Sequence, residues 1–389
     1  MFDPNKLSAC DEETIRNAYM IKKNSVSPSI ILFGTRYYNE PVAAKIFTLF
    51  ERNVITSVRQ YLSTRNRNYL DFYIRAMHGL IYECQVYQVI NRLMDYNVSP
   101  NFVRLYTVER CDYNFIASLL KRPVEAMLNT LELAKVIGVN ILKKLPVLVI
   151  VTRRPKISND FMTFLSRKDI VYEDIMDVIF QIIYTLKALI VNGVSHQDLH
   201  LSNILVEELD QRTDLFYTID DKTSFQVRTR FIARLFDWDT AYVKSLGKNK
   251  FLSPEDCQTY GHCNVSNRKF DLFLFLCRLS MMCSNDLGYR KLSSSVKQGM
   301  CDNFLMDVFK AASTSSEQLY DNIKKYWYNN KSDQGFYCFL RNHLPDAVMK
   351  DHLWILKSPY FDRLRISTSE IKIKDKKGNM YSLRNIMKN

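Results

Sequence analysis

The feature that most constrains the fold is a long apolar helix that ends at a glycine. Between residues 172 and 192, isoleucine, valine and leucine recur at helical spacing, which predicts a helix with one broad face in a core. Gly193 stands where glycine commonly ends a helix, because it adopts left-handed backbone angles without strain. A short polar loop, residues 194–203, and the apolar segment 204–206 follow, so a helix, a loop and a strand come in close succession.

The composition is that of a soluble globular protein with a large core. Of 389 residues, 47% are hydrophobic and 24% charged, and only ten are glycine and ten proline, so long flexible linkers are not expected. No apolar run is long enough to span a membrane. The first twenty residues lack the basic start and apolar core of a signal peptide, so we expect a cytoplasmic protein.

The charge and the cysteines indicate partners and compartment. A net charge of +13 favours acidic partners, but no basic cluster alternates with aromatic residues, so nucleic acid is not indicated beyond the charge itself. Nine cysteines, an odd number without a Cys-x-x-Cys pair, fit a reducing compartment. Cys257, His262 and Cys263 match the spacing of a structural zinc site poorly.

A lone lysine stands within a predicted strand in the first part of the chain. Residues 29–33 and 41–47 are apolar runs on either side of a polar turn, which predicts two strands, and Lys45 is the one charge in the second. Residues 76–95 have helical spacing and carry Glu83. Taken alone, a lysine in an edge strand is a solvent-facing charge, and a glutamate in a helix is uninformative.

The sequence also predicts a division into two parts. Residues 145–151 form a continuous apolar, β-branched run, typical of a buried strand, that ends at the polar stretch 152–155. We interpret this stretch as a hinge between residues 1–152 and residues 153–389, the second of which ends in a basic tail.

The loop after Gly193 carries the most specific chemical pattern. It reads His196-Gln197-Asp198, and Asn203 follows five residues after the aspartate. This matches His-x-Asp-x-x-x-x-Asn, in which the aspartate accepts the proton of an attacking hydroxyl and the asparagine offers an oxygen to magnesium. The alternative is a capped turn in which both side chains only satisfy backbone donors.

Further elements follow in the order that this chemistry requires. Asp237-Trp238-Asp239 comes directly after a strand predicted over residues 232–236. Asp271 opens a nearly all-apolar helix predicted over residues 270–284, where an unpaired carboxylate would be costly. With the lysine and the glutamate described above, they complete an ordered set.

In this set the chain resembles the eukaryotic protein-kinase superfamily over roughly residues 20–290, and more narrowly the divergent Ser/Thr kinases of large nucleocytoplasmic DNA viruses. The resemblance implies an α+β fold with two lobes: a small β-rich N-lobe with an insertion around residues 51–78, and a larger, mainly helical C-lobe. It implies a Ser/Thr protein kinase with ATP and Mg²⁺ or Mn²⁺ as cofactors and a protein substrate as partner. The implied location is the cytoplasm, of a host cell or within a virion if the chain is viral.

The resemblance assigns a role to each matching residue. Asp198 orients and deprotonates the substrate hydroxyl, and Lys45 steadies the phosphates with Glu83 behind it. Asp271 braces the backbone of the catalytic loop. The assigned residues are, for catalysis, Asp198, Asn203 and Lys45, for metal, Asp237 and Asn203, and for the nucleotide, Lys45, Glu83, Ile31 and Ser29.

The chain departs from the family before the lysine. With Ile31 at the position of the family's valine, fourteen residues upstream of Lys45, the three expected glycines fall near Asn24, Val26 and Ser29. None of these residues is a glycine, so close approach of the backbone to phosphates is harder.

Other departures lie around the catalytic loop. Gln197 replaces the arginine that reads a phosphorylated activation loop, His200 replaces a lysine, and Asp239 stands where glycine is usual. No Ala-Pro-Glu occurs between Asp237 and Asp271, and this segment normally shapes the peptide-substrate site. A protein substrate is therefore the weakest of the implied properties.

The second part of the chain also predicts an additional hairpin. Residues 215–219 and 224–227 alternate as two short strands would, with Asp220 and Asp221 at their turn. Aspartates are common in turns without any functional role.

Two other functions stay open. A pseudokinase, such as a scaffold protein of a virion, would keep the fold without catalysis and would explain the missing glycines. A small-molecule kinase of the aminoglycoside or choline type has a loop that reads His-x-Asp-Leu-His-x-x-Asn, which Asp198-Leu199-His200 fits well.

Overall fold

The structure is a computed structural model that describes residues 19–23, 30–37, 40–47, 63–64, 68–111, 147–252, 254, 257, 262–266, 269–283, 292–310, 351–367 and 379–387. The chain divides into two compact units, Met1–Gln88 with Val103–Lys156, and Val89–Phe102 with Ile157–Asn389. It has the α+β organisation in two units that the sequence predicts, and the protein-kinase fold itself stays a prediction. The assignment of residues 1–152 and 153–389 to the two lobes stays a prediction.

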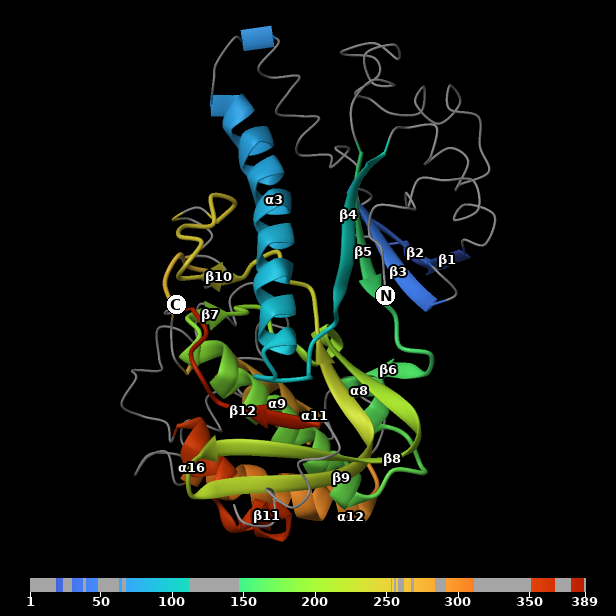
Figure 1. The fold of residues 1–389 in the computed structure, drawn as a ribbon, viewed down its shortest axis with the longest axis vertical. Helices are drawn as coiled ribbons and strands as arrows, with labels where there is room; N and C mark the ends of the chain where they lie inside the picture. Colours follow the sequence, from blue (N-terminus) through green and yellow to red (C-terminus); the bar gives the residue numbers. More distant parts are fainter. Residues whose placement is uncertain are drawn as a thin grey trace. The chain divides into compact units, whose positions relative to one another are not determined.

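The first unit is built on an antiparallel sheet of five strands in the order β1-β2-β3-β5-β4 (Figure 1). The strands are β1 (Tyr19–Lys23), β2 (Ile30–Tyr37), β3 (Glu40–Phe47), β4 (Leu105–Cys111) and β5 (Val147–Arg153). β3 is the central strand, because it pairs with β2 on one side and β5 on the other. Lys45 therefore lies in a central strand, whereas the alternative of a solvent-facing lysine required an edge strand.

Helix α3 (Asn68–Asp95) is longer than predicted. The sequence indicated a start at residue 76, yet the helix begins at Asn68, inside the stretch predicted as an insertion. Toward its C-terminal end Tyr82, Val86 and Ile90 are buried while Gln85 and Gln88 are exposed. One face of the helix thus packs in a core, as the spacing of its apolar residues predicts.

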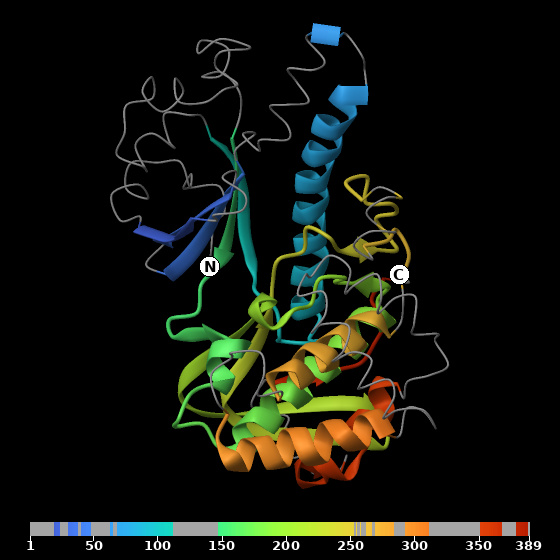
Figure 2. The ribbon, with the colours of Figure 1, turned by 180° about the vertical axis from the view of Figure 1, so that it is seen from behind.

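The second unit has a core of two helices and a long hairpin (Figures 1 and 2). Helix α9 (Tyr172–Val191) has the predicted bounds, and α11 (Phe270–Met282) is buried along almost its whole length, also as predicted. The hairpin β8 (Ile204–Asp220) and β9 (Thr223–Leu235) packs against α9, where the Phe180 ring contacts those of Tyr217 and Phe225. Around this core lie α8 (Phe161–Leu165), α12 (Ser294–Val296), η3 (Lys297–Leu305), α13 (Met306–Lys310), α16 (His352–Leu356) and η4 (Pro359–Leu364).

The hairpin is one continuous pair of strands rather than a short strand with an additional hairpin. The sequence separated residues 204–206 from 215–219 because the intervening stretch holds Glu207, Glu208 and Asp210, which break the apolar pattern. The ladder itself is irregular between Glu208 and Thr213, which explains the missing alternation. Asp220 lies at the turn, as predicted, and accepts a hydrogen bond from the backbone of Lys222 at 3.0 Å.

Short strands extend the hairpin into a sheet. β11 (Arg365–Ile366) pairs with β9, β6 (Ser158–Asp160) pairs with β8, and β12 (Met380–Ser382) pairs with β8 in parallel. The segment after β12 is held to the end of α9, since the Asn192 side chain accepts from the Ile386 amide at 2.9 Å and donates to the Arg384 carbonyl at 3.0 Å.

Among the described residues, disulfide bonds join Cys257 to Cys263 and Cys283 to Cys301, and Cys111 is also disulfide-bonded, whereas Cys84 and Cys277 are buried thiols. The expectation of a reducing compartment does not predict these bonds, and the cytoplasmic location stays a prediction. The pairing of Cys257 with Cys263 is consistent with the poor zinc spacing. Within the residues that the structure describes, no helix is long and apolar enough to cross a membrane.

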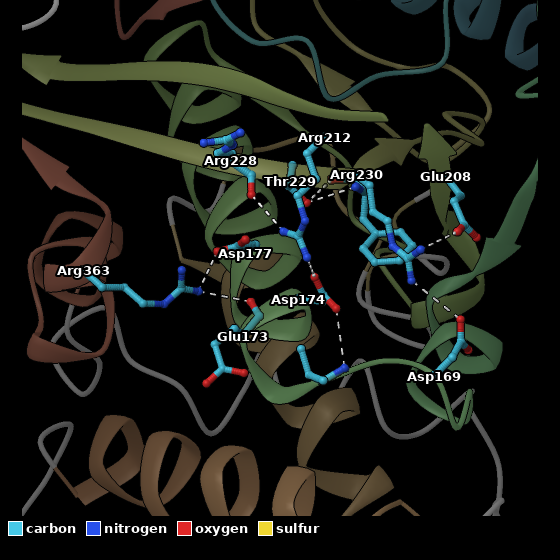
Figure 3. A network of polar contacts seen from close by, with 12 residues as sticks. Asp169, Glu173, Asp174, Asp177, Glu208, Arg212, Arg228, Thr229, Arg230 and Arg363 are labelled. Atoms are coloured by element: carbon cyan, nitrogen blue, oxygen red, sulfur yellow. Dashed lines mark hydrogen bonds and ion pairs between the residues drawn. The ribbon is translucent and has the colours of Figure 1, made fainter. Parts of the chain in front are cut away.

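Ion pairs gather at the start of α9 (Figure 3). Asp177 is 3% exposed and lies 2.5 Å from Arg363 of η4, and Asp174 lies 3.5 Å from Arg212 of β8. Burial raises the pKa of Asp177 to about 6, although Arg363 opposes the shift. Asp174 adds to the rise and Arg212 opposes it.

We expect Asp177→Asn to change how stability depends on pH. An unfolded aspartate has a pKa of about 3.9. Because the folded pKa is higher, the folded state binds the proton more tightly, and this stabilisation is complete below about pH 4 and lost as the pH rises through about 6. As the pH rises from 4 to 7, the wild type should therefore lose up to about 3 kcal/mol of free energy of unfolding that the variant does not lose. Denaturant titrations at several pH values measure this difference, and Asp210→Asn, at an exposed position of β8, is the control. A difference in stability that does not depend on pH would contradict the prediction.

Candidate active site

The first group of site residues is the pair formed by Lys45 on β3 and Glu83 on α3. The Lys45 Nζ donates to both carboxylate oxygens of Glu83, at 3.0 and 3.4 Å. The Glu83 side chain is fully buried and that of Lys45 is 14% exposed. A buried carboxylate of this kind requires a cation, because an unpaired one would be strongly destabilising. The predicted pairing is therefore present, and the solvent-facing alternative for Lys45 is wrong.

The environment of this pair also affects the neighbouring thiol. Burial, and next the negative charge of Glu83, raise the pKa of Cys84 to about 12, although Lys45 opposes the shift. Cys84 is therefore protonated at neutral pH and is not a nucleophile.

The second group lies on the loop between β7 (Val194–Ser195) and η1 (Leu201–Asn203). Gly193 ends α9 with a φ of +70°, as predicted. The Asn203 side chain donates to the Asp198 carbonyl at 2.9 Å and closes the loop on itself. The Asp198 side chain is 23% exposed, and its carboxylate lies 3.8 Å from His200. Asp198 is thus held by its backbone, and its carboxylate is partly exposed.

Asp271, in the first turn of α11, holds this loop by hydrogen bonds to its backbone. One carboxylate oxygen accepts from the His196 amide at 2.8 Å and the other from the Gln197 amide at 2.7 Å. Asp271 is 3% exposed, so these backbone donors serve in place of water. They also fix Gln197 at a φ of +69°, a region that non-glycine residues rarely occupy. The prediction that Asp271 braces the backbone of this loop is confirmed.

The register of the hairpin brings Asn203 and Asp237 to the same end. Ile204, the first residue of β8, is opposite Leu235, the last of β9. Beyond this pair the Phe236 amide donates to the Asn203 carbonyl at 3.2 Å, and the His196 ring is 2.9 Å from the Phe236 carbonyl. Asp237 follows with a φ of +69°, a left-handed backbone geometry that is uncommon for residues other than glycine.

The donors at this end fit a hard divalent cation. Asp237 offers a carboxylate, and Asn203 uses its amide nitrogen within the loop, so its oxygen is the atom that can bind metal. Mg²⁺ is commonly bound by one or two such oxygens together with substrate phosphates and water. Within the described part of the chain there is no cluster of three or more His, Cys, Asp or Glu side chains suited to a metal, so an all-protein cage is not built there.

Trp238 directly follows Asp237, after the end of β9. It is fully buried, and its ring centroid lies 4.6 Å from that of His196 and 6.0 Å from that of Phe102. This ring contact ties the residue after Asp237 to His196, so it holds the loop after Gly193 against the end of the hairpin.

Buried side-chain amides that were not predicted from the sequence join β9 to α9. Gln181 accepts from Asn101 at 2.8 Å and from the Ala233 amide at 3.1 Å, and donates to the Phe231 carbonyl at 2.9 Å. Both amide side chains are fully buried. The available signal was a glutamine within the apolar stripe of α9, where a polar group must find partners.

Part of the predicted nucleotide site lies outside the described residues. Ser29, Asn24 and Val26 belong to this part. Ile31 pairs with Lys23 and Ile46 in the sheet. The nucleotide-binding roles of Ile31 and Ser29 stay predictions. Lys45 and Glu83 belong to the first unit, and Asp198, Asn203 and Asp237 to the second.

Comparison with known proteins gives matches at the level of structure. Known protein families and curated protein sequences contain no match to this chain. Among solved structures it is similar to a crystal structure of the Rad53 kinase domain and SCD2, with a TM-score of 0.37 and 15% identity over 93% of this chain and 98% of that one. It is also similar to WaaP in complex with acyl carrier protein, with a TM-score of 0.35 and 10% identity over 87% and 92% of the two chains.

Proposed function

We propose that this protein is a phosphotransferase that uses ATP and Mg²⁺ or Mn²⁺, and that it is a Ser/Thr protein kinase. The observation that supports this most is the way in which the loop of Asp198 and Asn203 is held. Asp271 fixes its backbone on one side, and the paired ends of β8 and β9 join it to Asp237 on the other. A structural turn does not need a buried carboxylate to hold a strained loop, whereas a catalytic base must be positioned accurately.

The residues of this chain have distinct roles in the proposed reaction. Asp198 accepts the proton of the acceptor hydroxyl and orients its oxygen toward the γ-phosphate of ATP. Lys45 contacts the phosphates, and Glu83 keeps its ammonium group in position. Asn203 and Asp237 hold the cation, which when bound neutralises phosphate charge. The chain thereby supplies orientation and electrostatic stabilisation, the main requirements of phosphoryl transfer.

A small-molecule kinase is the second candidate, and one observation favours it. His200 lies 3.8 Å from the Asp198 carboxylate, at the position at which aminoglycoside- and choline-type kinases have histidine. The ordered pair of Lys45 and Glu83 and the support from Asp271 fit both kinds of kinase, so the acceptor is what separates them. A pseudokinase has no further support, because its argument rests on the glycine positions outside the described residues.

The direct test is phosphoryl transfer from labelled ATP. Purified protein is incubated with Mg²⁺ and, in separate reactions, with a mixture of proteins, an aminoglycoside or choline, and Asp198→Ala serves as the inactive control. We expect label on serine and threonine of protein acceptors only with the wild type. Label on a small molecule alone would show the second candidate to be correct. Metal-independent ATP binding without any transfer would support a pseudokinase instead.

We expect Asp237→Asn to weaken metal-dependent ATP binding by about tenfold to a hundredfold, because an amide is a poorer ligand for a hard cation than a carboxylate. ATP affinity measured with EDTA in place of Mg²⁺ should be unchanged within about twofold. Isothermal titration of both proteins with and without metal measures this difference, and Asp210→Asn is the control for loss of one surface carboxylate. An equal loss under the two conditions would place Asp237 outside the metal site.

A further inference from the structure

Gln197 is bonded through both atoms of its side-chain amide. Its oxygen accepts from the Cys263 amide at 2.7 Å, and its nitrogen donates to the Thr240 carbonyl at 3.2 Å. Gln197 is 1% exposed, so these bonds serve in place of water. One side chain of the catalytic loop thus holds two stretches that follow Asp239, one at Thr240 and one at Cys263.

The segment after Asp239 is also bonded to the loop by its own groups. The Thr240 hydroxyl donates to the His196 carbonyl at 3.2 Å. Beyond it, β10 (Tyr242–Val243) pairs with β7, and the Lys244 amide donates to the Gly193 carbonyl at 2.8 Å. Residues 240–244 therefore run along the start of the catalytic loop, antiparallel to it.

Two more buried or partly buried amides shape the rest of this segment. Asn249, fully buried, donates to the carbonyls of Asp239 and Ala241, each at 3.1 Å. The Asn264 side chain accepts from the Asn249 backbone amide at 2.6 Å and donates to the Leu252 carbonyl at 3.0 Å. All four of these hydrogen bonds are between neutral groups.

We propose that Gln197 is a positioning residue that holds residues 239–252 against the catalytic loop, so that the loop of Asp198 is kept ready without phosphorylation of the segment. A phosphate is bound most strongly by a planar, charged guanidinium, and a neutral amide cannot make that charge-assisted contact. Gln197 instead contributes permanent bonds to two backbone groups. The effect on Asp198 rests on the proposed kinase function, whereas the order of the segment does not.

The test uses the full chain and two variants of Gln197. Gln197→Met keeps the size of the side chain without its hydrogen bonds, and Gln197→Glu keeps the acceptor but cannot donate to the Thr240 carbonyl. Gln211→Met, an exposed glutamine of β8, is the matched control. Hydrogen exchange is measured for peptides covering residues 239–252 and 262–266 and for peptides of α9, together with kcat and the KM for ATP.

We expect exchange in the two segments to become about tenfold faster in Gln197→Met, since each lost bond to a buried group weakens local order. Exchange in α9 should be unchanged, kcat should fall by about tenfold, and the KM for ATP should stay within about twofold. Gln197→Glu should show the same pattern for residues 239–252 but not for Cys263. Phosphatase treatment of the wild type should leave kcat unchanged.

Each other outcome contradicts a defined part of the proposal. Unchanged exchange in the two segments would show that Gln197 does not hold them, whether or not the protein has activity. Loss of activity after phosphatase treatment, restored by rephosphorylation, would show that the segment needs a phosphate. If Gln197→Met does not fold, Thr240→Val removes the bond to the His196 carbonyl from the opposite side, and faster exchange confined to the same segment is then expected.

Discussion

Asp198→Asn is expected to lower the rate of phosphoryl transfer by about 10²–10⁴-fold, the usual contribution of a positioned general base. The change keeps the size of the side chain, and the contact with Asn203 uses the Asp198 backbone carbonyl, so the loop should keep its conformation. Because the aspartate acts on the acceptor hydroxyl, the affinity for ATP should stay within about twofold. Single-turnover transfer and ATP binding, measured on one preparation, test both statements.

The control for this experiment is Asp210→Asn, which makes the same chemical change on the exposed part of β8. It should leave turnover unchanged. Full turnover by Asp198→Asn would show that another residue is the base. A parallel loss of ATP affinity would mean that Asp198 acts on the nucleotide instead of the acceptor.

Asp271→Ala is expected to lower the free energy of unfolding by about 2–6 kcal/mol. It removes the acceptor of two buried backbone amides, those of His196 and Gln197, and each unsatisfied donor costs about 1–3 kcal/mol. A loss of this size is a large share of the total stability of an ordinary domain, about 5–15 kcal/mol. Asp271→Asn keeps one acceptor oxygen, so we expect about half the loss from it.

Denaturant titration of the Asn variant provides the measurement, because the Ala variant is the more destabilised of the two. Asp302→Ala, at an exposed position of η3, is the control for removing a helical carboxylate and should change stability by less than about 0.5 kcal/mol. Equal stability of Asp271→Asn and the wild type would mean that water or another group satisfies the loop amides.

The elements that the sequence predicted well are those whose signal is local. The bounds of α9 follow from its apolar stripe and Gly193, and the pairing of Asp198 with Asn203 in one loop follows from their five-residue spacing. Asp271 was predicted on a different ground. A single carboxylate in an apolar helix needs partners, and the resemblance to protein kinases indicated that these partners are backbone amides of the loop after Gly193.

The elements that the sequence could not predict depend on contacts between distant residues. Asn101 donates to Gln181, 80 residues away, and to the Ala233 carbonyl, 132 residues away, and nothing in the local pattern indicates either partner. The length of β8 was missed for a related reason, because charged residues interrupt its alternation while cross-strand bonds to β9 maintain it. The buried bonds of Gln197 were also hidden, since its sequence context shows only that an arginine is absent.

The parallel pairing of β12 with β8 has a consequence for the synthesis of the protein. Residues 216–218 emerge from the ribosome long before Met380–Ser382, their partners in the sheet. During that interval one side of β8 lacks its neighbour, and a strand with unpaired amides and carbonyls readily pairs with another chain. Contacts between residues so far apart also make folding slow, because a long loop must close before they form. Residues 216–218 therefore form an exposed strand edge until Met380–Ser382 have been synthesised.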